Sequence, residues 1–407
     1  MRRVRCECGT RVYVDEGSLG RPIRCRCGRT LVVRRRPRSL TSKARALVRT
    51  LPARLDAALR AARKPGRRRA QTPAARAVAA LAWAYLAGAI GVAVVMRAWG
   101  DAWWPATMML FSGRWIFLLP LVPLVPAAAI VRRARPLGVL LLAGLIVLGP
   151  VMGFHSGWRR LLPNGSEVPP LRLVTFNADG GDSIAPRLAL LLADWRADVV
   201  TLQECGERLQ TAVRAQPGWY HHEVAQLCTL SRYPLGSAAA MDRSALAALR
   251  ASGEIGGAGY VVRYVVQGPT GPFGLVNLHL ETPRKGFEAL MRGDTRTMNA
   301  NTELRDLESD LARRWADGAL APAVIAGDFN TPAESRIFAR HWGDLDDAFD
   351  RVGFGFGATK YNGWIRVRID HVLTGSGWRA VSARVGGAAG SDHRPLMVEL
   401  ERRVDSR

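Results

Sequence analysis

The stretch APAVIAGDFNTPAES, residues 321–335, decides the fold of the C-terminal half of this chain. It is an apolar run that ends in a carboxylate and an amide, Asp328 and Asn330, on either side of Phe329. Side chains two positions apart on a strand share a face, so the two polar groups should point together while Phe329 turns into a core. The stretch therefore predicts a buried strand that carries chemistry at its end.

Five further segments combine a strand-like run with polar groups that an ordinary sheet would not bury. Taken alone, each polar residue has an ordinary interpretation as a turn cap, a solvated strand end or a satisfied core histidine. Together, carboxylates, amides and histidines at strand ends are the groups that a divalent cation and a phosphate oxyanion need. The segments are LRLVTFN with Asn177, DVVTLQE with Glu204, GLVNLHL with Asn277 and His279, IRVRIDHVL with Asp370, and GSDHRPLMVEL with Asp392 and His393.

The motifs GDFN (327–330) and SDHRP (391–395) resemble those of the endonuclease/exonuclease/phosphatase superfamily, and the similarity covers residues 171–401 in the family's order. The resemblance implies an α/β fold, a four-layer sandwich of two mixed β-sheets flanked by helices, with the site at one end. It also implies an enzyme that hydrolyses a phosphodiester in a nucleic acid, a phospholipid headgroup or a small molecule, with Mg²⁺ or Mn²⁺ at the catalytic site.

The resemblance implies metal and water roles for five residues. Glu204 looks like the carboxylate that binds Mg²⁺ directly, with Asn177 and Asp392 nearby in its shell. Asp328 resembles the group that orients and deprotonates the attacking water. Asn330 resembles the amide that steadies this water or the phosphoryl oxygens.

Two histidines and a carboxylate complete the implied site. His393 looks like the histidine that faces the phosphoryl group, held by Asp370. His279 occupies the position of a second histidine in the nuclease and sphingomyelinase branches. The sequence leaves open whether Asp328 or His393 takes the proton.

A second class of function is a membrane adaptor that binds phosphorylated ligands without cleaving them. A binding module has no use for both an Asp/Asn pair and a His/Asp pair. We therefore favour the enzyme over the adaptor.

The net charge of +24 suggests a nucleic-acid binder only until it is divided along the chain. Residues 1–76 contain 23 Lys and Arg against 4 Asp and Glu, whereas residues 171–407 contain 28 of each. A neutral catalytic domain argues against long DNA as an obligatory partner.

Three uncharged runs, residues 77–96, 115–131 and 136–158, are near the length needed to cross a bilayer as helices. The second contains three prolines, and a buried soluble hairpin is its alternative. Arginines at 76 and 132–135 should stay cytoplasmic, which predicts an integral membrane protein with a cytoplasmic N-terminus and an extracytoplasmic catalytic domain. If the second run does not span the membrane, the predicted location of the catalytic domain is the cytoplasm.

The N-terminal segment RCECGTRVYVDEGSLGRPIRCRCGRTLVV, residues 5–33, places two C-x-C-G pairs on either side of an expected hairpin. It resembles a small zinc-ribbon module, and the alternative is a cluster of reduced thiols. The resemblance implies structural Zn²⁺ held by Cys6, Cys8, Cys25 and Cys27.

Four parts follow from these patterns: a zinc-ribbon-like module at 1–36, a basic linker or amphipathic segment at 37–76, three membrane helices at 77–158, and the catalytic domain at 167–407. The bilayer and a phosphodiester substrate are the expected partners. Cys205 and Cys228 in the last part have two possible states, a disulfide outside the cytoplasm or two buried free thiols.

Overall fold

The computed structural model describes residues 2–14, 22–32, 72–161, 169–246 and 260–403. The chain forms two compact units, Met1–Gln71 and Thr72–Arg407. Residues 37–71 of the predicted basic linker or amphipathic segment lie outside the described residues.

In the N-terminal unit, each cysteine pair occupies the turn of its own hairpin. The strands β1 (Arg2–Arg5) and β2 (Arg11–Val14) form one antiparallel pair, and β3 (Pro22–Arg24) and β4 (Thr30–Val32) form the other. Gly9 and Gly28 close the two turns at a φ of +83°, a conformation that glycine adopts readily. The prediction of a single hairpin between the cysteine pairs is therefore wrong, because each C-x-C-G makes a turn of its own.

The second unit begins with a helical region. Two of its helices, Pro73–Trp99 and Ala134–Val151, are long and apolar enough to cross a membrane. A third span is added if the pair Trp104–Phe111 and Arg114–Ile130, which is bent by 92°, counts as one. The elements are α2 (Pro73–Trp99), α3 (Trp104–Phe111), η2 (Arg114–Leu118), α4 (Leu121–Ile130), α5 (Ala134–Ile146) and η3 (Val147–Val151).

The helices differ from the predicted runs at their ends. Helix α2 begins before residue 77, because Pro73 suits a first helical position and the Thr72 hydroxyl accepts a hydrogen bond from the Ala75 amide at 3.2 Å. The second predicted run is broken into η2 and α4. In the third predicted run, residues 136–158, the helix ends at Val151 and the chain turns at Gly153, which has a φ of +73°.

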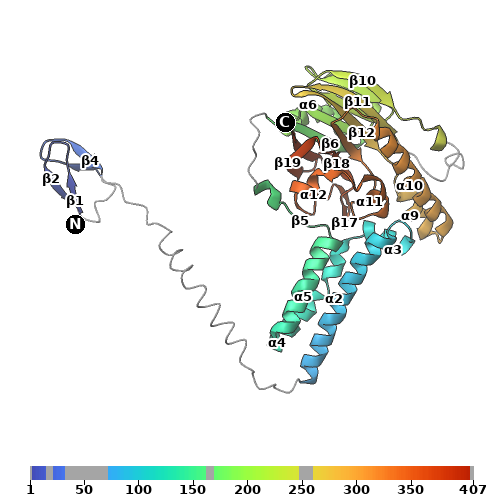
Figure 1. Cartoon of the computed structure of the whole chain (residues 1–407), viewed down its shortest axis with the longest axis horizontal. Coiled ribbons are helices and arrows are strands. Elements are labelled where there is room, and N and C mark those ends of the chain that lie inside the picture. Colours follow the sequence, from blue (N-terminus) through green and yellow to red (C-terminus); the bar gives the residue numbers. More distant parts are fainter. Residues whose placement is uncertain (1, 15–21, 33–71, 162–168, 247–259, 404–407) are drawn as a thin grey trace. The chain divides into compact units, whose positions relative to one another are not determined.

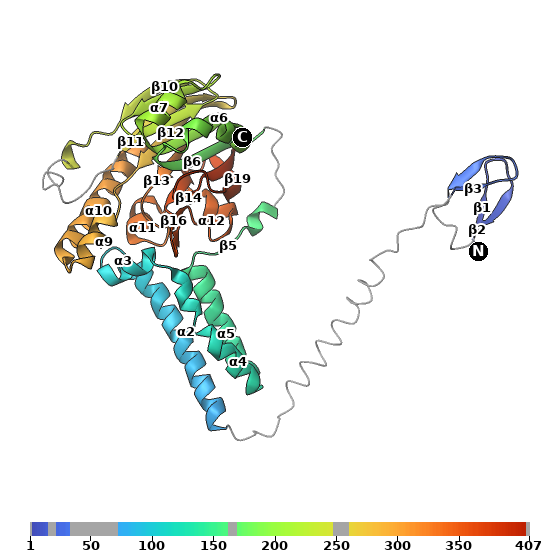
Figure 2. The ribbon, with the colours of Figure 1, turned by 180° about the vertical axis from the view of Figure 1, so that it is seen from behind.

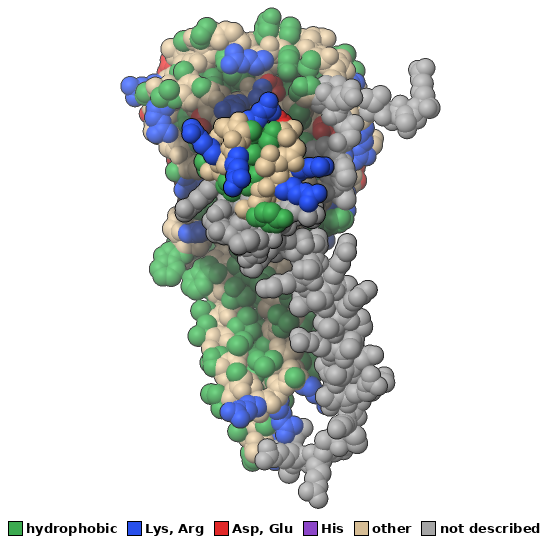
Figure 3. All heavy atoms as spheres, turned by 90° about the vertical axis from the view of Figure 1, so that its left-hand side faces the viewer, with side chains coloured by type: hydrophobic (Ala, Val, Ile, Leu, Met, Phe, Trp, Pro, Cys, Tyr) green, Lys and Arg blue, Asp and Glu red, His purple; other side chains and the backbone are tan. Residues whose placement is uncertain are grey.

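Helix α4 runs back along α2 and α5, so the helical region is a three-helix stalk (Figures 1 and 2). Ala82, Ala128 and Leu140 of the three helices pack together at its centre. Figure 3 shows that apolar side chains cover the outside of this stalk and that basic side chains lie at its far end. Outward-facing apolar residues include Leu81, Ile90, Val94, Val122, Leu141 and Leu145.

The rest of this unit contains two six-stranded mixed sheets. The first has the order β19-β20-β6-β7-β9-β8, in which only β6 and β7 are parallel neighbours. Strands that are far apart in the sequence are neighbours in this sheet, so residues near 175, 200 and 397 lie side by side. The bounds are β6 (Leu171–Gly180), β7 (Val199–Cys205), β8 (Tyr220–Val224), β9 (Leu227–Ser231), β19 (Trp378–Val385) and β20 (Leu396–Arg402).

The second sheet has the order β10-β11-β12-β13-β18-β14, with β12 and β13 as its parallel pair. Two short pairs lie beside it: β5 (His155–Ser156) with β15 (Phe354–Gly355), and β16 (Lys360–Asn362) with β17 (Ile365–Val367). The bounds are β10 (Leu235–Ala240), β11 (Tyr260–Gly268), β12 (Gly271–His279), β13 (Ala323–Asp328), β14 (Asp346–Asp347) and β18 (Asp370–Thr374).

The sheets pack face to face around buried apolar residues such as Leu173, Leu275 and Val324. Helices cover both outer faces, with Leu188 and Leu209 packed on the first sheet and Leu304 and Phe338 on the second. This layering confirms the predicted sandwich of two mixed sheets between helices. The helices are α6 (Leu188–Trp195), α7 (Glu207–Arg214), α9 (Arg284–Met291), α10 (Thr295–Asp317), α11 (Arg336–Trp342) and α12 (Ala348–Val352).

Candidate active site

The ends of strands from both sheets meet at one edge of the sandwich. Asn177 and Glu204 come from the neighbouring strands β6 and β7, whereas Asp328 and Asp370 come from the paired strands β13 and β18. His279 ends β12, directly beside Asp328 in the parallel ladder. Because parallel neighbours end at the same edge, residues remote in sequence are brought together here.

The side-chain amide of Asn177 joins the two sheets. Its Nδ2 donates to Glu204 Oε1 at 2.9 Å and to Asp328 Oδ2 at 2.9 Å. Its Oδ1 accepts from the backbone amide of Asp179 at 3.0 Å, which fixes the orientation of the amide. Two carboxylates from opposite sheets are thereby held around one donor.

His393 and Asp370 form a buried pair. The Nδ1 atom of His393 lies 2.8 Å from Asp370 Oδ2, and its Nε2 lies 3.7 Å from Asp328 Oδ2. The backbone amide of Asp370 donates to the Thr359 hydroxyl at 3.2 Å. Because Asp370 engages Nδ1, the ring presents Nε2 to Asp328 and to the open end of the site.

His279 faces the same carboxylates from β12. Its Nε2 atom lies 3.7 Å from both Glu204 Oε1 and Asp328 Oδ2. Its Nδ1 atom is buried and has no hydrogen-bond partner among the described residues.

The GDFN motif turns sharply after β13. Asn330 has a φ of +49°, its amide donates to Asp328 Oδ1 at 2.9 Å, and its side chain donates to the Leu280 carbonyl at 2.8 Å. Phe329 is fully buried and packs edge-on against Trp342, with ring centroids 5.0 Å apart. Phe329 enters the core as expected, but strand alternation does not place Asn330 beside Asp328, because β13 ends at Asp328 and Asn330 belongs to the turn.

A glycine is required at position 327, next to Asp328. A Cβ at this position would lie 1.9 Å from the Leu278 carbonyl oxygen of the neighbouring strand. Only glycine therefore lets β13 approach β12 closely enough to set Asp328 beside His279.

Glu204 is also held in an uncommon backbone conformation, with a φ of +47°. The next residue, Cys205, forms a disulfide with Cys228 of β9, with the Cα atoms 6.0 Å apart. Of the two states considered for these cysteines, the structure has the disulfide. It ties the end of β7, next to Glu204, to β9.

Asp392 lies at the rim of the site, and its partner was not foreseen from the sequence. Its Oδ2 forms an ion pair with Lys360 of the β16–β17 hairpin, and its Oδ1 lies 3.9 Å from His393 Nε2. The backbone amide of Tyr361 donates to the Asp392 carbonyl at 2.8 Å. Asp392 and His393 precede β20 rather than opening it, because the strand begins at Leu396.

Asn277, which the sequence groups with the candidate site residues, lies instead in a polar bridge between the sheets whose other members, Gln203 and Thr229, were not foreseen. Gln203 Nε2 donates to Asn277 Oδ1 at 2.8 Å, and Asn277 Nδ2 donates to Thr229 Oγ1 at 3.0 Å. All three residues are buried between the sheets. The sequence could have indicated Gln203, because it is a polar residue within the apolar run of β7, where a buried strand normally has an apolar residue.

Burial and neighbouring charges raise the pKa of two groups of the site, Asp328 and His393. Burial raises the pKa of Asp328, and the nearby charge of Asp370 raises it further. Burial alone would lower the pKa of His393, but the charges of Asp370 and Asp328 outweigh it and the net shift is upward. The pair therefore consists of a carboxylate that binds protons more readily than usual and a histidine that stays protonated to higher pH.

The residues present fit a divalent metal. One ligand atom each from Asp328, Asp370 and His393 lies within 4.8 Å of the other two. The buried oxygens Asp370 Oδ1 and Asp392 Oδ1 have no hydrogen-bond partner among the described residues. Glu204 adds a further carboxylate, and such hard oxygen donors are what Mg²⁺ and Mn²⁺ bind.

The four N-terminal cysteines also gather at one point. Cys6 Sγ lies 3.8 Å from Cys27 Sγ, and Cys8 Sγ lies 3.7 Å from Cys25 Sγ. Ligand atoms from all four lie within 4.8 Å of one another. Four thiols from two turns suit a tetrahedral zinc ion.

One family model and several solved structures are similar to this chain. The sequence profile described as the Endonuclease/Exonuclease/phosphatase family matches residues 174–393, more than half of the chain. Among solved structures, the 3'-5' exonuclease NExo from Neisseria meningitidis is 18% identical, with a TM-score of 0.44 over 56% of this chain and 99% of that chain. No curated protein sequence matches the chain.

Two other solved structures are similar. The human Nocturnin catalytic domain with bound sulfate is 14% identical, with a TM-score of 0.42 over 60% of this chain and 99% of that chain. TDP2 from D. rerio, complexed with single-strand DNA product, is 16% identical, with a TM-score of 0.40 over 57% of this chain and 98% of that chain.

The profile match spans both motifs of the candidate site, GDFN and the first residues of SDHRP. Nuclease and phosphatase activities both hydrolyse phosphoric ester bonds, so the expected class of enzyme is confirmed. The chain belongs to the endonuclease/exonuclease/phosphatase family.

Proposed function

We propose that the protein is a membrane-anchored phosphodiesterase that depends on Mg²⁺ or Mn²⁺. The observation that carries this proposal is the double hydrogen bond from Asn177 to Glu204 and Asp328, with His393 facing the same Asp328 oxygen. Groups from both sheets thus surround a space that suits one cation and one phosphoryl group.

Asp328 would orient and deprotonate the attacking water. Its raised pKa makes it a stronger base than an ordinary aspartate, while the Asn177 amide keeps one oxygen in place. Asn330 follows Asp328 in the sharp turn, where its side chain is fixed on the Leu280 carbonyl. It would limit the directions from which the water can approach.

His393 would donate a hydrogen bond from Nε2 to a phosphoryl oxygen. Asp370 accepts the Nδ1 proton and keeps the imidazolium oriented, and its charge favours the protonated ring. His279 would add a second donor on the side of Glu204. These donors would neutralise charge that develops on the phosphoryl oxygens.

Glu204 would hold the metal, with Asn177 and Asp392 close by. When bound, the ion would polarise a phosphoryl oxygen and stabilise charge in the transition state. Lys360 would hold Asp392 in place through their ion pair. In the N-terminal unit, Cys6, Cys8, Cys25 and Cys27 would bind a structural Zn²⁺.

The helical region would anchor the catalytic domain outside the cytoplasm. Arg132 and Arg133 lie between α4 and α5, at the opposite end of the stalk from Val151, after which the chain enters the catalytic domain. Positive charge at that end supports a cytoplasmic location for it. The Cys205–Cys228 disulfide supports an oxidising compartment for the catalytic domain.

The test uses the full chain purified in detergent, because the catalytic domain packs on the helices. It would be offered DNA, sphingomyelin, phosphatidylinositol, and aryl phosphate monoesters and diesters, with Mg²⁺, Mn²⁺ or EDTA. We expect metal-dependent cleavage of a diester that is lost in Asp328→Ala. Binding of phosphorylated ligands with no turnover across the panel would favour the adaptor instead.

A further inference from the structure

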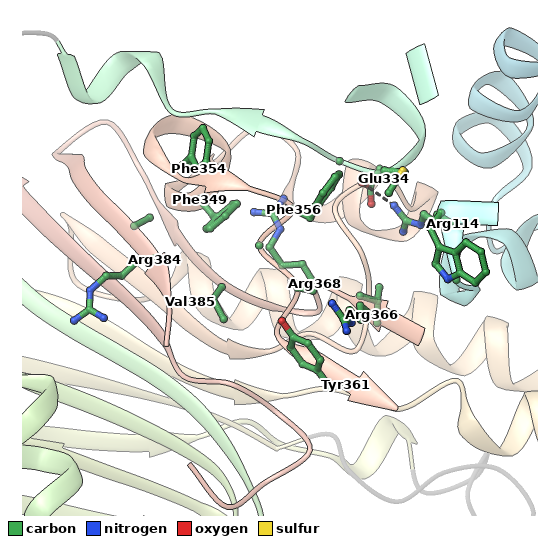
Figure 4. A pocket seen from close by; sticks show the side chains of 18 of the residues that line it. Arg114, Glu334, Phe349, Phe354, Phe356, Tyr361, Arg366, Arg368, Arg384 and Val385 are labelled. Atoms are coloured by element: carbon green, nitrogen blue, oxygen red, sulfur yellow. Dashed lines mark ion pairs between the residues drawn. The ribbon is translucent and has the colours of Figure 1, made fainter. Parts of the chain in front are cut away.

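A large cavity lies where the helical region meets the catalytic domain (Figure 4). Its volume is 950 Å³, within the range of about 300–1,000 Å³ typical of ligand sites. Arg114, Trp115, Met152 and Gly153 contribute one wall from the ends of the helical segments. None of the residues of the candidate active site lines it, so the cavity is a separate site.

The cavity carries an excess of positive charge. Two of its arginines are neutralised: Arg114 lies 2.9 Å from Glu334, and Arg368 lies 3.2 Å from Asp347. The cavity's other arginines are exposed and have no ion pair among the described residues. These are Arg160, Arg366 and Arg384. A ligand with one or more negative charges would therefore complement the lining.

Exposed aromatic rings surround the same cavity. Phe354 and Phe356 are 66% and 40% exposed, and both rings pack against Phe154 just beyond the last helix. Trp364, which is 78% exposed, stacks on Trp115 at a centroid distance of 6.0 Å. A free soluble phosphate would gain nothing from these rings, whereas aromatic residues are characteristic of the boundary between lipid and water.

Arginine and aromatic groups occur together on one short hairpin. Arg366 lies over the ring of Tyr361 at 5.5 Å, and Figure 4 shows both side chains at the cavity beside Arg368. The tip of this hairpin carries Trp364 and Ile365, which are both exposed. The planar guanidinium of Arg366 suits the oxygens of a phosphate. The exposed apolar tip of the hairpin suits an acyl or glycerol moiety.

We propose that this cavity binds the headgroup of an anionic phospholipid from the leaflet next to the catalytic domain. The phosphate would lie among Arg160 and Arg366, and the glycerol and first acyl carbons would lie against Trp115 and Trp364. The proposal rests on membrane anchoring but not on catalysis. Tyr361 contacts the backbone of Asp392, so a bound lipid would also support the rim of the active site.

The test measures lipid binding to the full chain in neutral detergent by native mass spectrometry, with EDTA present to prevent turnover. Dioleoylphosphatidylglycerol and dioleoylphosphatidylcholine are titrated in parallel, together with sn-glycerol 3-phosphate as the soluble phosphate. We expect one tight site that prefers phosphatidylglycerol. The variant Arg160→Gln/Arg366→Gln should weaken this site about 30-fold, because each basic residue at a membrane surface contributes about a factor of five.

The matched control is Arg208→Gln/Arg314→Gln, which removes two exposed arginines from α7 and α10 outside the cavity. This control should bind phosphatidylglycerol as the unmodified protein does. Equal weakening by both variants, equal affinity for the two lipids, or equally tight binding of glycerol phosphate would overturn the proposal. Selective binding of phosphatidylglycerol by a protein that turns over no substrate in the metal-supplemented panel would instead contradict only the proposed hydrolysis.

Discussion

Asp101 and Arg305 form a buried ion pair that joins the helical region to the active site. Asp101 Oδ1, in the loop after α2, lies 3.2 Å from Arg305 Nη1 of α10, and their side chains are only 3% and 1% exposed. The other end of the same guanidinium donates from Nη2 to the Asn330 carbonyl at 3.2 Å. The GDFN turn is therefore supported by a carboxylate from outside the catalytic domain.

Asp101→Asn should strongly destabilise the protein, because it removes the carboxylate that pairs with the buried Arg305 charge and leaves that charge only neutral acceptors such as the Asn330 carbonyl. Breaking such a pair costs about 3–5 kcal/mol of unfolding free energy. Thermal unfolding in detergent would measure the loss. The control Asp310→Asn breaks the exposed pair with Arg314 and should cost about 1 kcal/mol or less. Equal melting temperatures for the two variants would show that the buried pair contributes nothing special.

Asp370→Asn should leave the fold intact and reduce turnover about 10²- to 10⁴-fold, the usual contribution of a positioned acid or base. Burial opposes protonation of His393, and the charge of Asp370 is the main cause that raises its pKa. Without that charge the pKa falls, so the protonated ring is lost at lower pH. The decline of the rate on the alkaline side should therefore move to lower pH in a pH–rate profile. An unchanged rate would remove the His393–Asp370 pair from the mechanism.

Glu204→Gln should raise the Mg²⁺ concentration needed for half-maximal rate, because an amide binds a hard cation more weakly than a carboxylate does. A metal titration of turnover after EDTA treatment measures this directly. The control Glu207→Gln, three residues further on the exposed side of α7, should behave as the unmodified enzyme. An identical Mg²⁺ dependence in both variants would assign the metal to other ligands.

The Cys205–Cys228 disulfide closes a loop with a sequence separation of 23. Replacing both cysteines by serine should lower the unfolding free energy by about 3 kcal/mol, since the unfolded chain regains the entropy of that loop. Protein purified without reducing agent should contain no reactive thiol at these two positions. Labelling of Cys205 or Cys228 by a maleimide without prior reduction, located by peptide mass mapping so that the four N-terminal cysteines are counted separately, would contradict both the disulfide and an oxidising compartment.

Much of the site could be predicted because its residues sit at the ends of apolar runs. Asn177, Glu204 and Asp328 each come at the end of an apolar run, where a polar side chain is unusual and indicates a site. The strands that carry them are neighbours in the sheets, so these strand ends lie close together. The family resemblance of the SDHRP motif pointed to His393, which lies before β20, whereas His279 ends the strand-like run of β12.

The remaining features depend on tertiary contacts that no local pattern encodes. Lys360 lies on a three-residue strand with no apolar run to mark it, and it acquires its role only through Asp392. In the sequence Asp101 is an ordinary loop residue, and only the tertiary structure places Arg305 of α10 beside it. The break in the second membrane run follows from Pro120, which precedes α4, and from packing against α2 and α5.

Gly327 has a consequence for the interpretation of variants. Even an alanine methyl would meet the Leu278 carbonyl, forcing two adjacent strands apart and moving Asp328 away from His279. A substitution at a residue with no side chain should thus silence the enzyme as completely as loss of a reacting group. Surveys of natural or clinical sequence changes in such proteins should score this glycine among the inactivating positions.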